Sequence, residues 1–304
     1  MPALPGAVRD RIHVVLSFDD AFWAPAYAVM RSACLSSKRR GDMVFHLLHM
    51  PLSEEHRADL EAITTEFGAE LRWYPLAEQP IFDTFTAGLK TSAQWPRVVY
   101  ARLLLGELLP PDVERVLYLD CDMLVRRPLE ELFDTDLGGK PIGAVLDTLH
   151  PFIMGRRDMR ENPDIFDLAE PYFNSGLMLV DMAGWRAMDV RGAMGELAAR
   201  GWLARLQYDQ DMLNIIFRGQ WKALPWRWNT MDAHRAHETL NPAILHFTGL
   251  NKPWALTAGI RRSTAYARWY RHVMTNALFY RFARQRWKRW WLKRLPFGAG
   301  VSRR

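Results

Sequence analysis

The stretch VLYLDCDMLV, residues 116–125, decides how this sequence is interpreted. It is an apolar run that ends in two acids, Asp120 and Asp122, separated by one residue. Side chains alternate along a strand, so we expect both acids on one side and Cys121 on the other. Carboxylates seldom leave water, and two crowded ones repel unless a proton or a cation lies between them. The pair therefore favours a hard divalent cation, whereas helix capping or pairing with Lys and Arg is the alternative for an isolated Asp-x-Asp.

Other apolar runs alternate with stretches of helical spacing. We expect buried strands at residues 12–18, 43–48, 71–74, 115–119, 142–146 and 177–180. Ser53 is placed to cap a helix that ends at Gly68, and Pro128 to begin a short helix through Phe133. This alternation predicts an α/β fold with a mostly parallel sheet flanked by helices. Ligands of such folds bind beyond the carboxyl ends of the strands, where the two acids fall.

Composition sets the class of protein. The chain has 304 residues, of which 49% are hydrophobic and 24% charged, and this predicts a globular protein with a substantial core. The sequence shows neither a basic leader with a cleavage site nor an apolar run of about 18 residues. Its two cysteines, Cys34 and Cys121, are too few for a disulfide framework. We therefore expect a cytoplasmic protein.

Charge is distributed unevenly. Residues 239–304 contain 14 Lys and Arg and no acidic residue, which leaves 26 basic against 34 acidic residues before them. We therefore divide the chain into a body, residues 1–258, and a basic tail, residues 259–304.

The tail interleaves basic and aromatic residues in FYRFARQRWKRWWLKRLPF, residues 279–297. Its large apolar residues cluster on one helical side: Phe279, Ala283, Trp287, Trp290 and Trp291. This composition predicts a helix on an anionic membrane surface, at the cytoplasmic face of the inner membrane. The alternative is a basic helix docked on the acidic body. Nucleic-acid binding is not expected, because the segment lacks a recognised reading module.

A second motif, LHFTGLNKPW, spans residues 245–254. His246 could supply an imidazole to the same metal, which would favour manganese over magnesium. Gly249 allows close approach of the backbone, and Lys252 offers a compact charge suited to phosphate. Singly, His246 and Trp254 are more typical of core packing, but together the residues predict the wall of a phosphate site.

Four segments occur in the order and approximate spacing of a known family: VLYLDCDMLVRRPLEELFDTDL, YFNSGLMLVDMAGW, YDQDMLN and HFTGLNKPW. They resemble the retaining sugar-nucleotide glycosyltransferases of family 8, especially bacterial lipopolysaccharide galactosyl- and glucosyltransferases. The resemblance covers about residues 12–256. It implies a GT-A type nucleotide-binding fold for residues 1–258, a UDP-sugar donor and a divalent cation.

The resemblance also implies roles for the residues that bind the donor. Asp120, Asp122 and His246 would hold Mn²⁺, with Mg²⁺ as the alternative, and the ion would grip the donor diphosphate. Lys252 and the backbone near Gly249 would contact the phosphates.

The segment SFDDAFW, residues 17–23, matches the family's uridine-binding end. It begins with Ser17; Asp19 would bind the uracil edge and Phe22 would stack on it. Ala21 stands where relatives often carry Asn, and Phe22 where Tyr is common, so uridine selectivity is less firmly implied than metal binding.

The sugar and acceptor pocket is implied by four matching positions, Asp147, Asn174, Asp209 and Gln210, and Arg102 matches the family's donor-site arginine. Arg102 would approach the sugar and nucleotide, although a surface arginine on an amphipathic helix is the alternative. Asp211 could simply cap the helix that runs on through Phe217. Gln210 matches the residue nearest the anomeric carbon, and an amide is a poor nucleophile. Substitution on the face from which the leaving group departs is therefore expected rather than a covalent intermediate on Asp209 or Asp147.

Together these residues predict a Mn²⁺-dependent retaining hexosyltransferase that moves galactose or glucose from a UDP-sugar to lipopolysaccharide or another glycolipid. One alternative is a haloacid-dehalogenase-like phosphatase, whose Asp-x-Asp lies near the chain start and is usually followed by Thr or Val where this chain has Leu124. The other is a non-catalytic, membrane-tethered protein that binds sugar nucleotides or glycans.

Overall fold

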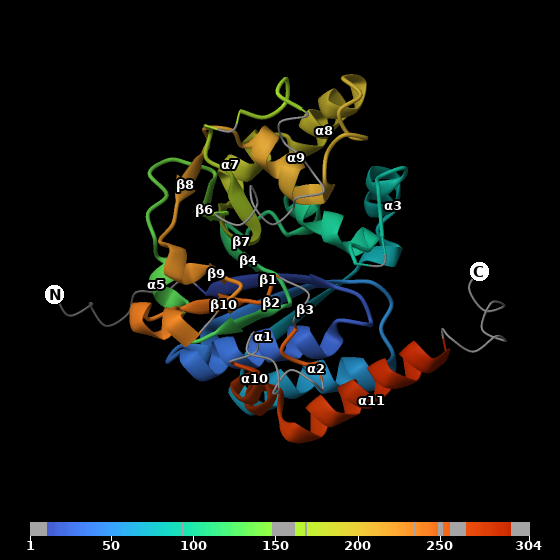
Figure 1. Cartoon of the computed structure of the whole chain (residues 1–304), viewed down its shortest axis with the longest axis vertical. Coiled ribbons are helices and arrows are strands. Elements are labelled where there is room, and N and C mark those ends of the chain that lie inside the picture. Colours follow the sequence, from blue (N-terminus) through green and yellow to red (C-terminus); the bar gives the residue numbers. More distant parts are fainter. Residues whose placement is uncertain are drawn as a thin grey trace.

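A central mixed sheet lies between two layers of helices in the computed structural model (Figure 1). The structure describes residues 11–92, 94–147, 162–167, 169–233, 235–248, 252–255 and 266–292. The strands are β1 (Ile12–Phe18), β2 (Met43–His49), β3 (Glu70–Pro75), β4 (Arg115–Leu119), β5 (Met123–Val125), β6 (Ile142–Leu146), β7 (Phe173–Asp181), β8 (Trp221–Ala223), β9 (Thr230–Met231) and β10 (Ile244–His246).

The helices cover both faces of the sheet. They are α1 (Trp23–Ser36), α2 (Glu54–Phe67), α3 (Pro80–Thr86), α4 (Leu105–Leu108), α5 (Glu130–Phe133), α7 (Met182–Ala187), α8 (Val190–Ala199), α9 (Tyr208–Ile216), α10 (Ala267–Met274) and α11 (Asn276–Leu292). The longest 3-10 helix is η3 (Arg97–Leu104). No described helix combines the length and the apolar character that a bilayer crossing requires.

The large sheet has the order β3-β2-β1-β4-β7-β6-β8. Neighbouring strands are parallel except where β7 pairs antiparallel with β4 and with β6. The prediction of a mostly parallel sheet is therefore confirmed, and all six expected strands are present. The expected strand at 177–180 is longer in the structure, because β7 already begins at Phe173.

Strand β1 shows how the two core layers arise. Val14, Leu16 and Phe18 lie in the cluster that contains α1, whereas Val15 lies in the cluster on the opposite face. Both sets are buried, because each face of the sheet is covered by helices. Figure 1 shows α1, α2, α10 and α11 on one side and α7, α8 and α9 on the other.

The local signals at α2 are confirmed. The Ser53 side chain accepts a hydrogen bond from the His56 N–H, and Gly68 follows the helix with a left-handed φ of 71°. The short helix that was predicted through Phe133 is present, but the prediction that it begins at Pro128 is wrong. The helix α5 starts at Glu130, because its helical hydrogen bonds begin at the Leu129 carbonyl, which accepts from the Phe133 N–H.

The second, smaller sheet has the order β5-β10-β9. Strand β5 follows β4 after the three residues 120–122 and pairs antiparallel with β10. The register places His246 opposite Met123, and the Phe247 N–H donates to the Asp122 carbonyl at 2.9 Å. This pairing brings the motif at 245–254 beside the two acids.

The C-terminal helices pack on the body. Tyr270 of α10 and Leu278, Phe279 and Phe282 of α11 are buried in the same core cluster as α1. Phe279 and Ala283, which were expected on one helical side with the tryptophans at a membrane surface, are instead buried by this packing against the body. Trp287, Trp290 and Trp291 are exposed by 60%, 48% and 47%. The docked alternative thus describes the first half of α11, while the division of the chain at residue 258 stays a prediction.

Candidate functional site

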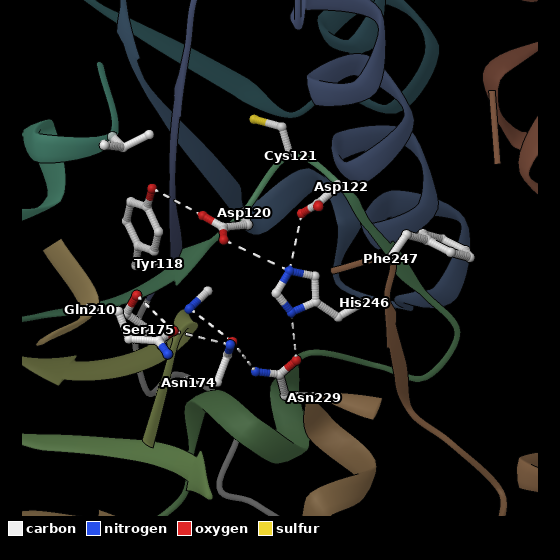
Figure 2. A network of polar contacts seen from close by, with 12 residues as sticks. Tyr118, Asp120, Cys121, Asp122, Asn174, Ser175, Gln210, Asn229, His246 and Phe247 are labelled. Atoms are coloured by element: carbon white, nitrogen blue, oxygen red, sulfur yellow. Dashed lines mark hydrogen bonds and ion pairs between the residues drawn. The ribbon is translucent and has the colours of Figure 1, made fainter. Parts of the chain in front are cut away.

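Asp120, Asp122 and His246 converge at the carboxyl end of β4 (Figure 2). One ligand atom from each lies within 4.8 Å of the others. The His246 Nε2 is 3.1 Å from Asp122 Oδ1 and 3.8 Å from Asp120 Oδ2. Cys121, between the acids, is buried, and its Sγ lies 3.5 Å from the Ser17 carbonyl oxygen. The expected separation of the acids from the cysteine is confirmed.

The outer oxygens of the two aspartates bind cationic side chains. Arg102 donates to Asp120 Oδ1 at 2.7 Å, and the Lys252 ammonium lies 2.6 Å from Asp122 Oδ2. Burial by itself would raise the pKa of Asp122, but the neighbouring Lys252 and His246 lower it well below the usual range for aspartate. Asp122 is thus held as a carboxylate, the form that binds a metal ion.

The orientation of His246 follows from a chain of hydrogen bonds that begins at a backbone N–H. The Gly176 N–H donates to Asn174 Oδ1 at 3.1 Å, and that oxygen also accepts from the Asn229 amide at 2.8 Å. The Asn229 Oδ1 therefore faces His246 Nδ1, 2.8 Å away, and can only accept. Nδ1 therefore donates to Asn229, and Nε2 is the ring nitrogen that faces the two aspartates and would bind the ion.

The site fits a divalent cation by its shape and its donor set. Gly176 lies under the cluster, and a Cβ atom there would be 2.5 Å from His246 Cε1 and 2.7 Å from Asp120 Oδ2. Two carboxylates and one imidazole suit Mn²⁺ and also allow Mg²⁺. Asp120, Asp122 and His246 would hold the ion, and Asn229 would orient the imidazole from behind.

Arg102 is buried and connects the candidate metal cluster, formed by Asp120, Asp122 and His246, to α9. Besides Asp120, it approaches Asp209 Oδ2 at 3.0 Å and donates to the Ser175 carbonyl at 2.9 Å. Burial opposes its charge, but Asp120 and Asp209 raise the pKa of Arg102 above its ordinary value. The alternative of a surface arginine is wrong, since its exposed fraction is 5%. Burial also raises the pKa of Asp209, an effect that the charge of Arg102 opposes.

Gln210 lies at the centre of a second polar network. Its Oε1 accepts from the Ser175 N–H at 3.0 Å and from the Asn174 amide at 3.1 Å. Its Nε2 donates to Asp147 Oδ2 at 3.0 Å, an oxygen that also accepts from Asn174 at 3.1 Å. Strands β6 and β7 and helix α9 thereby bring four predicted residues, Asp147, Asn174, Asp209 and Gln210, to one place. Figure 2 shows Asn174, Ser175 and Gln210 next to the metal cluster.

Asp211 has the structural role that was considered for it. It is fully buried, and its Oδ2 accepts from the Gln207 N–H at 2.6 Å, at the start of α9. Its Oδ1 accepts from the Tyr172 hydroxyl at 2.6 Å. Asp211 therefore fixes the helix that carries Asp209 and Gln210.

Of the predicted nucleotide-binding residues in the first motif, Ser17 lies in β1, and Asp19 and Phe22 come directly after it. The Ser17 hydroxyl lies 2.6 Å from the Tyr118 hydroxyl, and Asp19 Oδ1 accepts from the Ala21 N–H at 2.9 Å. Phe22 packs edge-on against Trp254 with ring centroids 5.7 Å apart. The two motifs at residues 17–23 and 245–254 are thus in contact. Gly249 lies outside the described residues.

Three residues of the site were not predicted from the sequence: Tyr118, Ser175 and Asn229. Tyr118 shares a strand face with Asp120 and carries the Arg102 guanidinium 4.5 Å above its ring, so strand alternation could have indicated it. Ser175 lies in the quoted segment YFNSGLMLVDMAGW, which the structure places in β7. Asn229 follows WRW, in a segment without a recognisable motif, and only the tertiary structure places it behind His246.

Known proteins share this architecture. The chain is similar to the galactosyltransferase LgtC, whose crystal structure contains donor and acceptor sugar analogues. The TM-score is 0.71 at 27% identity, and the similarity covers 86% of this chain and 95% of LgtC. It is 24% identical to the lipopolysaccharide 1,2-glucosyltransferase of Escherichia coli, over 81% of this chain and 74% of that protein. It is 25% identical to general stress protein A of Bacillus subtilis, over 81% of this chain and 88% of that protein.

The fold is therefore that of the GT-A glycosyltransferases, as predicted. The sequence model of glycosyl transferase family 8 matches residues 13–258, which span the candidate metal cluster, the Gln210 network and the motifs at residues 17–23 and 245–254. The chain belongs to glycosyltransferase family 8.

Proposed function

We propose that this glycosyltransferase moves galactose or glucose from a UDP-sugar, with retention of anomeric configuration, to lipopolysaccharide or another glycolipid. The observation that carries the proposal is the convergence of Asp120, Asp122 and His246 within 4.8 Å, beside Lys252. Similarity to a galactosyltransferase and to a lipopolysaccharide glucosyltransferase supports the substrate classes. Family membership excludes the haloacid-dehalogenase-like phosphatase.

Charge stabilisation is the main task of this site. Breaking the anomeric bond drives negative charge onto the departing nucleoside diphosphate, and a bound Mn²⁺ or Mg²⁺ supplies Lewis-acid stabilisation of that charge. The Lys252 ammonium lies next to Asp122, where it can bind the same phosphates. Asp19 and Phe22, which follow β1, would hold the uridine. A preorganised contact of this kind contributes on the order of 3 kcal/mol to lowering the barrier.

Retention requires either a covalent intermediate or attack on the face that the leaving group vacates. Asp209 is paired with Arg102, and Asp147 accepts from the amides of Asn174 and Gln210. These contacts reduce the nucleophilicity of both carboxylates. They support same-face substitution, in which Gln210 orients the sugar and the departing phosphate takes the acceptor proton.

We also propose that the protein binds the cytoplasmic face of an anionic membrane through the distal half of α11. Trp287, Trp290 and Trp291 are exposed there, and Leu292 beside them is exposed by 51%. Tryptophan favours the headgroup region, and each nearby basic residue contributes about 1 kcal/mol of attraction to anionic lipid. This location would bring the site to a lipid-linked acceptor.

A donor and acceptor screen tests the enzymatic proposal. UDP release is followed with UDP-galactose, UDP-glucose and other UDP-sugars, with Mn²⁺ or Mg²⁺, and with or without extracted glycolipid. We expect metal-dependent release that the acceptor accelerates, and loss of that release in Asp122→Asn. Full transfer by Asp122→Asn would contradict the metal site. Tight UDP binding without turnover on any glycolipid would favour the non-catalytic sugar-nucleotide-binding alternative.

A further inference from the structure

Asp20 ties the loop after β1 to two helices. It directly follows Asp19, and its Oδ1 lies 2.6 Å from His56 Nδ1 and accepts from the Ser53 N–H at 3.2 Å. Its Oδ2 accepts from the Arg289 guanidinium at 2.8 Å. Ser53 and His56 lie at the start of α2, whereas Arg289 comes from the distal half of α11. One carboxylate thus joins segments that are 269 positions apart in the sequence.

His56 connects the same loop to α11 by a second route. The imidazole is buried and stacks on Trp23 with ring centroids 4.3 Å apart. Its Nε2 lies 3.2 Å from Gln285 Oε1, on α11. Trp23 in turn contacts Phe282 of α11 edge-on, with centroids 6.1 Å apart. Because these rings are enclosed, the loop and the helix are held in a fixed relation.

The residues of α11 that make these contacts form one stripe. Arg281, Gln285 and Arg289 are spaced by four positions, so they lie on the same face of the helix. Arg281 pairs with Glu55 at 3.0 Å and also with Asp59, both on α2. The basic helix therefore meets an acidic surface formed by α2 and Asp20, a use of the tail charge that is separate from lipid binding.

We propose that α11 clamps the donor-binding loop and that Asp20 is a positioning residue for the nucleoside. This inference rests on the proposed function, in which Asp19 and Phe22 bind uridine. Those two residues flank Asp20 within two positions, so a carboxylate fixed by His56 and Arg289 restricts the backbone that carries both. A loop that is ordered before binding loses less conformational entropy when the nucleotide arrives.

The clamp has a distinct kinetic signature. Among the described residues, Asp20 binds Ser53, His56 and Arg289 rather than the metal ligands or the Gln210 network, so loosening it should weaken donor binding without changing the chemical step. The Michaelis constant for the donor should rise while kcat stays nearly constant, whereas damage to the metal site would lower kcat.

The test compares Asp20→Ala, Asp20→Asn and Arg289→Ala with Arg284→Ala. Arg284 is an exposed residue of the same helix, so its removal matches the loss of charge without touching the loop. UDP affinity is measured by calorimetry with saturating Mn²⁺, and donor hydrolysis supplies KM and kcat. Mn²⁺ affinity without nucleotide checks the metal site, and thermal unfolding checks the fold.

We expect UDP affinity to fall about tenfold in Asp20→Ala and about threefold in Arg289→Ala, because a partly exposed ion pair contributes modestly. Asp20→Asn, which keeps an acceptor for His56, should lie between Asp20→Ala and the wild type. The double variant Asp20→Ala/Arg289→Ala should bind UDP no more weakly than Asp20→Ala alone. The UDP affinity of Arg284→Ala should stay within about twofold of the wild type. In all variants, kcat and the affinity for Mn²⁺ should also stay within about twofold of the wild-type values.

Two results would overturn the inference in distinguishable ways. If the wild type binds UDP and both Asp20→Ala and Arg289→Ala retain its affinity, the clamp is wrong and the proposed function stands. If the wild type binds no UDP in the presence of Mn²⁺, the proposed donor is wrong, and the clamp falls with it. Should Asp20→Ala fail to fold, Asp20→Asn and Arg289→Ala still decide the question, because both keep the buried packing of His56.

Discussion

The Nδ1 atom of His246 lies 2.8 Å from Oδ1 of Asn229, and this contact decides which ring nitrogen faces the two aspartates. The orientation of the Asn229 amide follows from its other hydrogen bond, in which its Nδ2 donates to Asn174 Oδ1. That oxygen also accepts from the Gly176 backbone N–H. A backbone N–H within β7 of the large sheet therefore helps to orient an imidazole on the smaller sheet. Mutation of an outer contact of this kind typically costs about 10- to 100-fold in metal affinity or activity.

Asn229→Ala should weaken Mn²⁺ binding by about 10- to 100-fold, because the imidazole loses the partner that orients it. Titration of the protein with Mn²⁺, followed by electron paramagnetic resonance of the free ion, measures the affinity. Asp122→Asn serves as the reference for loss of a ligand and should bind Mn²⁺ more weakly still. Unchanged affinity in Asn229→Ala would show that the orientation of His246 is set by something else.

Gly176→Ala should displace the metal ligands without unfolding the protein. The added methyl would lie 2.5 Å from His246 Cε1 and 2.7 Å from Asp120 Oδ2, so at least one ligand has to move. We expect a loss of Mn²⁺ affinity of at least about tenfold, by the same titration. Gly195→Ala, on α8, is the matched control, because its Cβ would meet nothing within 4 Å. Equal Mn²⁺ affinities for the two variants would contradict the close approach of Gly176 to the metal ligands.

The exposed tryptophans of α11 should determine binding to lipid. Replacing Trp287, Trp290 and Trp291 together by alanine is expected to lower partitioning into anionic vesicles by at least about tenfold, since each loses apolar contact with the interface. Co-sedimentation with vesicles of phosphatidylglycerol and phosphatidylethanolamine measures this change. Trp226→Ala, which removes a tryptophan that is 41% exposed outside the tail, is the control.

The triple substitution should leave release of UDP from a soluble donor unchanged, because the three tryptophan side chains are exposed. Deletion of the whole tail is a poorer test, since it would also remove Tyr270, Phe279 and Phe282 from the core cluster. Vesicle binding that survives the triple substitution would rule out the proposed membrane surface.

Stability should fall at acidic pH because of a buried histidine far from the site. His46 on β2 is fully buried, with Nε2 2.8 Å from His13 Nδ1 and Nδ1 2.9 Å from the Tyr74 hydroxyl. Burial, assisted by the charge of His13, lowers the pKa of His46 to about 3. Between pH 6.5 and 3, His46 is protonated in the unfolded chain but not in the folded protein. The stability that depends on neutral His46 is therefore fully present above pH 6.5 and is lost as the pH falls.

Each pH unit within that window should cost about 1.4 kcal/mol in the free energy of unfolding for this one group. Urea unfolding at pH 7.5, 6.5, 5.5 and 5.0 measures the slope. His46→Gln should lower the free energy of unfolding through lost packing. It should also make that free energy depend less on pH, by the equivalent of about one bound proton. Part of the pH dependence should remain in this variant, because burial also lowers the pKa values of His13 and His49. Equal slopes for variant and wild type would contradict the assignment.

Much of the fold could be predicted because it depends on patterns that are local in sequence. Strand β1 and helix α2 are defined by apolar spacing, by the Ser53 cap and by Gly68, and each signal acts within a few residues. The start of α5 was misplaced by two residues, because a proline favours the first turn without fixing where helical hydrogen bonding begins. Burial of Phe279 and Ala283 also escaped prediction, since an apolar helical face does not reveal whether protein or lipid covers it.

By itself the sequence determined the alternation of strands and helices, the two acids at a strand end, and the motifs that predicted the family. Only the tertiary structure decided that β10 pairs with β5, which carries His246 to Asp122, and that Asn229 stands behind it. The physical reason is range. Propensity and periodicity act over one or two turns of chain, whereas a metal cluster is made by contacts across 126 positions of sequence, which depend on the register of strands and the closure of the core.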